Sequence, residues 1–75
     1  MNLERIRVIL YYCCQPIRPK DLKQKVGFSE MSIFRLLNHC AEMGLVKREG
    51  ERRNVTYSTT DLGSGVLKEL SRRDH

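Results

Sequence analysis

Long apolar segments are missing from this 75-residue chain. The longest uninterrupted apolar run spans only Val8 to Cys14, whereas a helix that crosses a bilayer needs about 20 apolar residues. Charged side chains at Glu4, Arg5 and Arg7 precede that run, and such a start does not resemble a signal peptide. We therefore expect no membrane span and no export, and we expect the protein to act in the cytoplasm.

Cysteine is scarce and poorly spaced for a metal site. Cys13 and Cys14 are adjacent, so with Cys40 they cannot form the two spaced thiolate pairs of a structural zinc site, and His39 and His75 are the only other candidate ligands of that kind. Thiols that pack in the core as small apolar side chains explain the cysteines better. We expect no metal and no cofactor, while the sequence leaves disulfide formation open.

Catalytic signatures are also missing. There is no glycine-rich phosphate loop, neither histidine lies in a context typical of nucleophilic catalysis, and the acidic residues are scattered among basic ones. The sequence therefore predicts a protein that is not an enzyme and gives no sign of a small-molecule substrate.

Positive charge is what the chain has in excess. Fourteen Lys and Arg against nine Asp and Glu give a formal charge of +5 and a pI near 9.5, which favours a polyanionic partner. Composition alone leaves nucleic acid and an anionic membrane open. The short length and the lack of repeats predict a single domain over residues 1–75.

Apolar spacing predicts three helices in the first half of the chain. The first runs over residues 3–14 and ends before Pro16. The second runs over 20–26, with Pro19 in its first turn and Gly27 at its end. Ser29 caps the third, which runs to residue 43 before Gly44. The residues of the first helix that we expect to enter the core are Leu3, Ile6, Leu10 and Cys13.

The second half predicts a β-hairpin and a last helix. Residues 45–48 and 55–58 are short β-prone stretches around a polar turn over 49–54. Thr60 is placed to cap the last helix, in which Gly63 and Gly65 each cost up to about 1 kcal/mol relative to Ala. Packing must therefore hold that helix in place.

This order of elements resembles the winged helix-turn-helix domain of prokaryotic transcription regulators of the MarR and ArsR kinds. Residues 29–37 and 42–48 are similar to the family's recognition helix and its G-L-V/I-x-R entry to the wing. Residues 57–63 are similar to the Y-x-L-T-x-x-G that leaves the wing, with Thr59 in place of the usual leucine. The resemblance implies a mainly α fold with a small β-hairpin (α+β), and a sequence-specific, double-stranded DNA-binding transcriptional regulator that acts as a repressor.

The winged-helix resemblance distributes DNA contacts over three groups of residues. The third helix would enter the major groove, the hairpin would touch the flanking minor groove or backbone, and the second helix would contact phosphates. Arg35 suits guanine, Asn38 suits adenine, and Phe34 either touches a thymine methyl group or packs against the second helix. The recognition-helix set is Ser29, Glu30, Met31, Ser32, Phe34, Arg35 and Asn38; the wing set is Arg52, Arg53 and Asn54; the phosphate set is Arg18, Lys20, Lys23 and Lys25.

A second apolar face on the first helix predicts a homodimer. Val8, Tyr11 and Tyr12 lie away from the expected core face and would leave an exposed apolar patch on a monomer. We expect a second copy to cover them, with Val66 and Leu70 of the last helix contributing, so that two recognition helices lie about 34 Å apart. In the alternative, the last helix folds back over Val8 and Tyr12 within one chain.

Two other functions fit the sequence less directly. Winged helices also serve as protein–protein interaction or assembly modules without specific DNA binding, and the basic face would then be incidental. Binding of RNA or single-stranded nucleic acid is a further alternative, but the aromatic residues are not interleaved with basic ones in a sheet.

Overall fold

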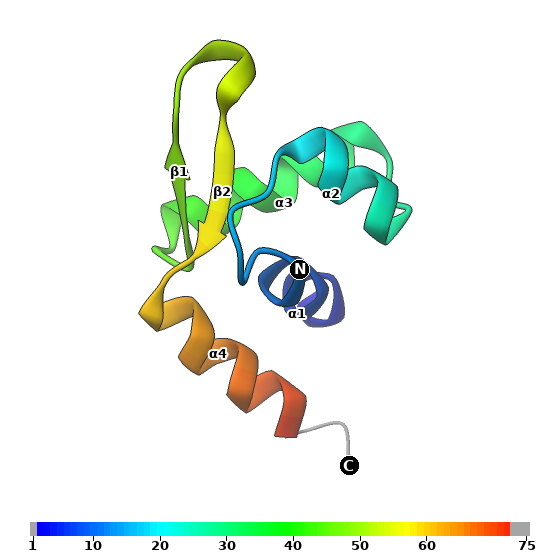
Figure 1. Cartoon of the computed structure of the whole chain (residues 1–75). Helices are drawn as coiled ribbons and strands as arrows, with labels where there is room; N and C mark the ends of the chain where they lie inside the picture. The colour runs from blue at the N-terminus through cyan, green and yellow to red at the C-terminus, as the bar shows by residue number, and fades with distance from the viewer. Residues whose placement is uncertain (1, 73–75) are drawn as a thin grey trace.

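Helices and a hairpin follow one another in the predicted order (Figure 1). The computed structural model describes residues 2–72. Within that range the elements are α1 (Leu3–Tyr12), α2 (Pro19–Val26), α3 (Glu30–Glu42), β1 (Val46–Glu49), the short 3-10 turn η1 (Arg52–Asn54), β2 (Thr56–Thr59) and α4 (Asp61–Arg72). The predicted α+β winged helix-turn-helix class is confirmed, although α1 ends at Tyr12 rather than at Cys14.

Local hydrogen bonds at the helix ends explain why most boundaries could be predicted. The Ser29 hydroxyl accepts from the backbone N–H of Ser32 at 3.2 Å, and the Thr60 hydroxyl accepts from that of Gly63 at 3.1 Å. After α2 and α3 the chain turns through Gly27 and Gly44, whose φ angles are +72° and +75°. Glycine adopts this left-handed conformation at no steric cost, so both helices stop there.

The core is formed by α1, α2, α3 and the hairpin, with one correction on α1. Leu3 was expected to be buried, but it is 54% exposed, whereas Ile9 is fully buried. Helix α1 packs against α2, α3, β2 and α4, and Leu3 lies in its first turn, where it borders an open apolar groove beside α4. The buried apolar residues are Ile6, Ile9, Leu10, Cys13, Leu22, Ile33, Leu37, Cys40, Leu45, Val46, Val55 and Tyr57.

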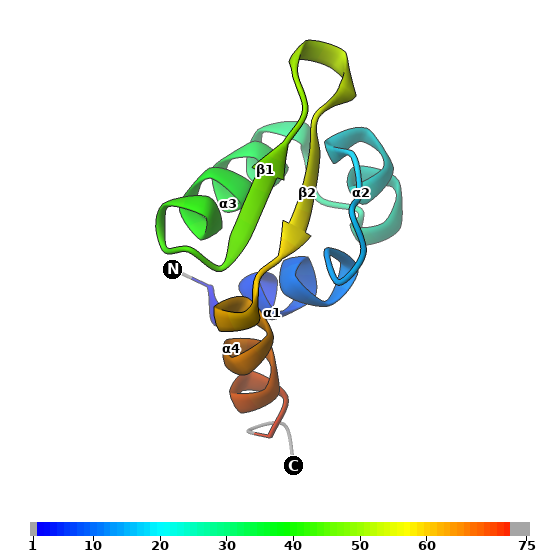
Figure 2. The same cartoon turned by 60° about the vertical axis from the view of Figure 1, so that its left-hand side comes forward.

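The hairpin is attached to the helix-turn-helix through β2. Strands β1 and β2 pair antiparallel from Val46 opposite Thr59 to Glu49 opposite Thr56. On the other side of β2, Ile17 and Tyr57 exchange two backbone hydrogen bonds of 3.0 and 2.9 Å. The segment that leads into α2 is therefore fixed beside the wing, and the hairpin tip projects past the helices (Figure 2).

Helix α4 packs against α1 and is held by close contacts at its start. The Thr59 hydroxyl donates to the Leu10 carbonyl at 2.8 Å, so the threonine that stands in place of the leucine of the Y-x-L-T-x-x-G pattern has a polar partner. A Cβ atom on Gly63 would lie 2.0 Å from the Leu45 carbonyl oxygen. Gly63 lowers the helix propensity of α4, as expected, but only glycine allows α4 to approach the Leu45 carbonyl this closely.

The three cysteines are free thiols. Cys13 and Cys40 are buried in the core and Cys14 is exposed. Burial, with a smaller contribution from the neighbouring thiols, raises the pKa of Cys13 to about 12, and burial also raises the pKa of Cys40. Residues 2–72 contain no cluster of three or more His, Cys, Asp or Glu side chains that could hold a metal, and His75 lies outside the described residues. In the same range, no helix is long and apolar enough to cross a membrane.

Candidate nucleic-acid interface

A basic groove lies between the N-terminal ends of α2 and α3 and the hairpin. Its volume is about 540 Å³. Six of the lining side chains are Lys or Arg and one is acidic, while apolar residues form the rest. The lining consists of Arg18, Pro19, Lys20, Lys23, Glu30, Ile33, Phe34, Arg48, Arg52, Arg53, Val55 and Tyr57. Residues far apart in the sequence thus contribute to one positively charged surface.

Three of the four cations predicted to contact phosphates line this groove, from α2 and the residue that precedes it. Lys20 and Lys23 are exposed and lie one turn apart, and Arg18 precedes the helix. The Arg18 guanidinium is 3.4 Å from the Asp21 carboxylate, but both side chains are about half exposed, so this ion pair is weak. Lys25 does not line the groove and lies in a separate concavity beside Tyr11 and Tyr12. The phosphate set is therefore divided between two surfaces.

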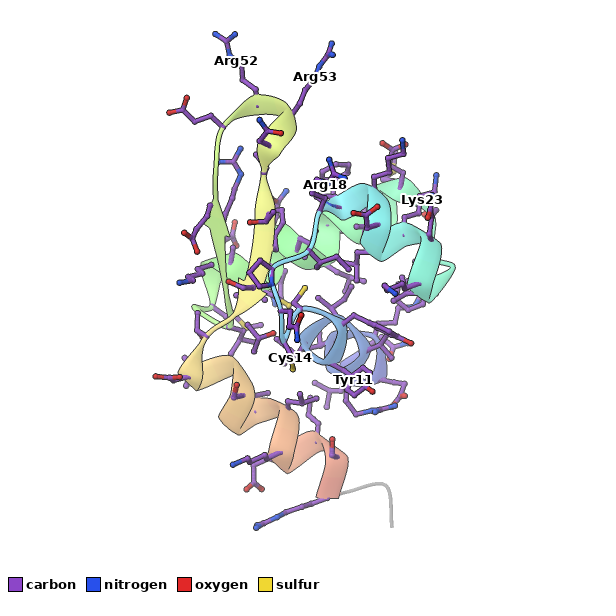
Figure 3. The ribbon with its side chains drawn as sticks, in the orientation of Figure 1. Tyr11, Cys14, Arg18, Lys23, Arg52 and Arg53 are labelled. Carbon is purple, nitrogen blue, oxygen red and sulfur yellow. The ribbon has the colours of Figure 1, made fainter. Side chains whose placement is uncertain are left out.

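The hairpin tip carries two arginines that point away from the body of the domain (Figure 3). Gly50 has a φ of +95°, and a Cβ atom there would lie 2.0 Å from the Asn54 carbonyl oxygen, so the turn is tight. Arg52 and Arg53 line the basic groove, while exposed Asn54 closes the η1 turn through a backbone hydrogen bond to Glu51 at 3.0 Å. The wing therefore extends the positive surface of α2.

Helix α3 presents a distinct outer ridge. With Ile33, Leu37 and Cys40 buried, the spacing of 3.6 residues per turn places Met31, Arg35 and Asn38 opposite the core. All three are exposed. This ridge is the part of α3 that faces away from the core.

The other predicted residues of the recognition-helix set lie on the flanks of α3 or cap it. Phe34 and Glu30 line the basic groove. Ser29 and half-buried Ser32 are hydrogen-bonded to each other: the Ser29 hydroxyl accepts from the Ser32 N–H and donates to the Ser32 hydroxyl at 3.0 Å.

Arg48 of β1 was not among the predicted site residues, but it also lines the groove. Its exposed position in the strand after Leu45 was the available signal.

The predicted dimer residues fall on two separate surfaces. Tyr11 and Tyr12 are 60% and 36% exposed, with ring centroids 5.1 Å apart in an edge-to-face arrangement, and Val8 is half-buried. Val66 and Leu70 are half-buried and line an apolar groove between α1 and α4. Helix α4 packs on α1 within one chain, but it leaves Tyr12, which the alternative expected it to cover, exposed together with Tyr11.

A family assignment follows from the sequence match. Residues 6–69 match the model of the O-methyltransferase dimerisation domain. The chain belongs to this family. No curated protein matches the sequence. This family was not among those predicted from the sequence, and its model extends from α1 to α4.

Solved structures with the same fold are MarR-type regulators. A MarR-family transcriptional regulator from Rhodococcus sp. RHA1 is 22% identical, with a TM-score of 0.83 over 92% of this chain and 52% of that one. Apo MarR from E. coli is 16% identical, with a TM-score of 0.76 over 93% and 53%. Wild-type ZitR from Lactococcus lactis in complex with DNA is 23% identical, with a TM-score of 0.70 over 93% and 49%. This dimerisation-family domain spans about half the length of these proteins and shares their winged-helix fold.

Proposed function

We propose that this domain is a sequence-specific, double-stranded DNA-binding transcriptional regulator. The observation that carries the proposal is the groove whose lining combines six Lys and Arg residues, from α2 and its N-cap, β1 and the wing, with a single acidic residue. In the proposed complex, α3 lies in the major groove, the wing lies on the flanking minor groove or backbone, and α2 contacts phosphates. The structure of ZitR in complex with DNA supports the proposal, because it shows a protein of this fold bound to DNA.

The charges in the groove are available to an external anion. Of the ion pairs made by the described residues, Arg18 with Asp21 is the one that involves this groove, and it is solvent-exposed. Phosphates that replace water around the other cations release condensed counterions, which supplies most of the affinity for any duplex. Base specificity then comes from the outer ridge of α3, where Arg35 is the candidate for guanine and Asn38 for adenine.

We propose repression as the regulatory effect and a homodimer as the active form. A domain that occupies a duplex blocks other proteins from the same site without any further contact. A second copy would cover Tyr11 and Tyr12, and the dimerisation family to which the chain belongs supports this assembly. Two grooves related by a two-fold axis would then read a palindromic site.

The family match also favours a second candidate function. Residues 6–69 match a domain described by its role in dimerisation, so the chain could serve as an assembly module that binds no DNA. In that case the groove cations would be ordinary solubility residues. The two candidates differ in their response to duplex DNA.

Fluorescence anisotropy with a labelled random-sequence duplex separates the two functions. We expect binding at moderate salt that weakens as salt rises, because phosphate contacts dominate. Lys23→Ala should weaken binding, whereas Lys68→Ala, which removes an exposed lysine from α4, should not. If the domain is an assembly module, it should not bind the duplex at moderate salt. If the two substitutions have equal effects, the groove is not part of the DNA interface.

A further inference from the structure

Two large apolar side chains are exposed on the first turns of α3. Met31 is 72% exposed and Phe34 is 42% exposed, and they lie one helical turn apart. Neither belongs to the core cluster, nor to the partly buried side chains that pack against it. The opposite face of α3 already fills the core through Ile33 and Leu37. Packing within the described residues therefore does not explain why these two positions are apolar.

The surroundings of this pair are strongly basic. Phe34 shares the groove with Lys20, Lys23 and Arg48, and Met31 lies on the outer ridge one turn before Arg35. The buried centre of a protein–protein interface is depleted of charged residues, especially lysine. Apolar side chains among cations suit the major groove of DNA, where the apolar feature on the base edges is the C5-methyl group of thymine.

We infer that Met31 and Phe34 read the C5-methyl groups of pyrimidines, and that the domain selects sites with thymine opposite the first turns of α3. This inference rests on the proposed DNA binding. Three residues of helix rise about 4.5 Å, which is close to the 3.4 Å base step. The two side chains therefore contact methyl groups on neighbouring base pairs when α3 lies along the groove.

Replacing thymine by deoxyuridine removes only the methyl group and tests the inference directly. Duplexes selected from a random library are resynthesised with deoxyuridine at one thymine at a time, and affinities are measured by fluorescence anisotropy. We expect the wild type to lose about fourfold in affinity at one or two positions, the equivalent of about one buried methyl group. Met31→Ala and Phe34→Ala should each bind the thymine and deoxyuridine duplexes equally at one of these positions.

Met43→Ala is the matched control. Met43 is as exposed as Phe34 but lies at the C-terminal end of α3, so its substitution should leave the discrimination unchanged. Thermal melts should show that all three variants remain folded, because each side chain is largely outside the core. A further arm places cytosine or 5-methylcytosine at the discriminating position. A gain in affinity on methylation supports the inference, and no gain contradicts it, because the same methyl group would then not be read on cytosine.

The failure of the inference and the failure of DNA binding give different results. Salt-dependent binding with equal affinity for thymine and deoxyuridine at every position overturns the methyl reading and leaves the DNA-binding function intact. Equal weakening of both duplexes by Met31→Ala and Phe34→Ala also overturns it. Absence of binding to every duplex overturns the proposed function together with the inference.

Discussion

Two glycines in α4 allow packing to be separated from helix propensity. Gly63 and Gly65 lie in the same helix, and in a helix interior Ala is favoured over Gly by about 1 kcal/mol. Apart from the backbone of its own helix and its chain neighbours, a Cβ atom on Gly65 would have no atom within 4 Å. A Cβ atom on Gly63 would lie 2.0 Å from the Leu45 carbonyl oxygen and 2.7 Å from the Thr59 Cγ2 atom. The two substitutions should therefore have opposite signs.

For Gly65→Ala we expect a gain of roughly 0.5–1 kcal/mol in the free energy of unfolding. In a domain of this size, each kcal/mol of added stability raises Tm by about 4–8 °C. For Gly63→Ala the backbone must shift, and overpacking of this kind costs about 1–3 kcal/mol. The shift would also strain the hydrogen bond from the Thr60 N–H to the Leu45 carbonyl, which is 3.0 Å long.

Thermal and urea denaturation followed by circular dichroism measures both changes. The two glycines are only two residues apart in α4. The difference in unfolding free energy between the two variants therefore reports the close contact of α4 with Leu45. Two variants that are stabilised alike would refute this reasoning, because α4 would then not approach Leu45 as closely as the structure shows.

Four further predictions concern thiol labelling, the pH dependence of stability, base reading and assembly. A thiol reagent should modify Cys14 in the folded protein and reach Cys13 and Cys40 only on unfolding; rapid labelling of all three would contradict their burial. Burial raises the pKa of Cys13 to about 12 from its ordinary value of 9.0. The thiol of the unfolded chain therefore ionises first, and the free energy of unfolding should fall by about 1.4 kcal/mol per pH unit between pH 9 and 12. Cys13→Ala should remove this loss. Arg35→Ala should weaken binding to a selected site by roughly 1–3 kcal/mol while leaving non-specific duplex binding nearly unchanged; an equal loss on all sequences would make Arg35 a phosphate contact. Sedimentation equilibrium should give a dimer that Tyr12→Glu dissociates, and a wild-type mass near 8.8 kDa at micromolar concentration would contradict the dimer.

Features that depend on local sequence could be predicted well. Ser29 and Thr60 cap their helices, and Gly27 and Gly44 end theirs, because each acts through hydrogen bonds or backbone conformation within a few residues. The exchange of Leu3 for Ile9 in the core could not be predicted. Residues that are apolar on several sides of α1 define no single buried face until α2, α3 and α4 are placed.

Features that depend on tertiary contacts were only partly accessible. From the sequence, Gly63 was expected only to lower the helix propensity of α4. The structure shows that glycine is needed there because the Leu45 carbonyl lies too close for a Cβ atom. The cations of α2 and the wing were predicted separately, and the structure brings them into one groove with Arg48. Lys25 was grouped with them by charge alone, although it lies on another surface of α2.

The salt dependence of duplex binding tests the central claim most directly. For the wild type, the logarithm of the binding constant should fall linearly with the logarithm of the salt concentration, with a slope of about −0.9 per phosphate contacted. Arg52→Ala combined with Arg53→Ala should lower affinity on every duplex and flatten that slope by up to about 2, while Lys68→Ala should leave it unchanged. A wild type that does not bind duplex DNA at moderate salt would contradict the DNA-binding function, and an unchanged slope in the double variant would exclude the wing from the interface.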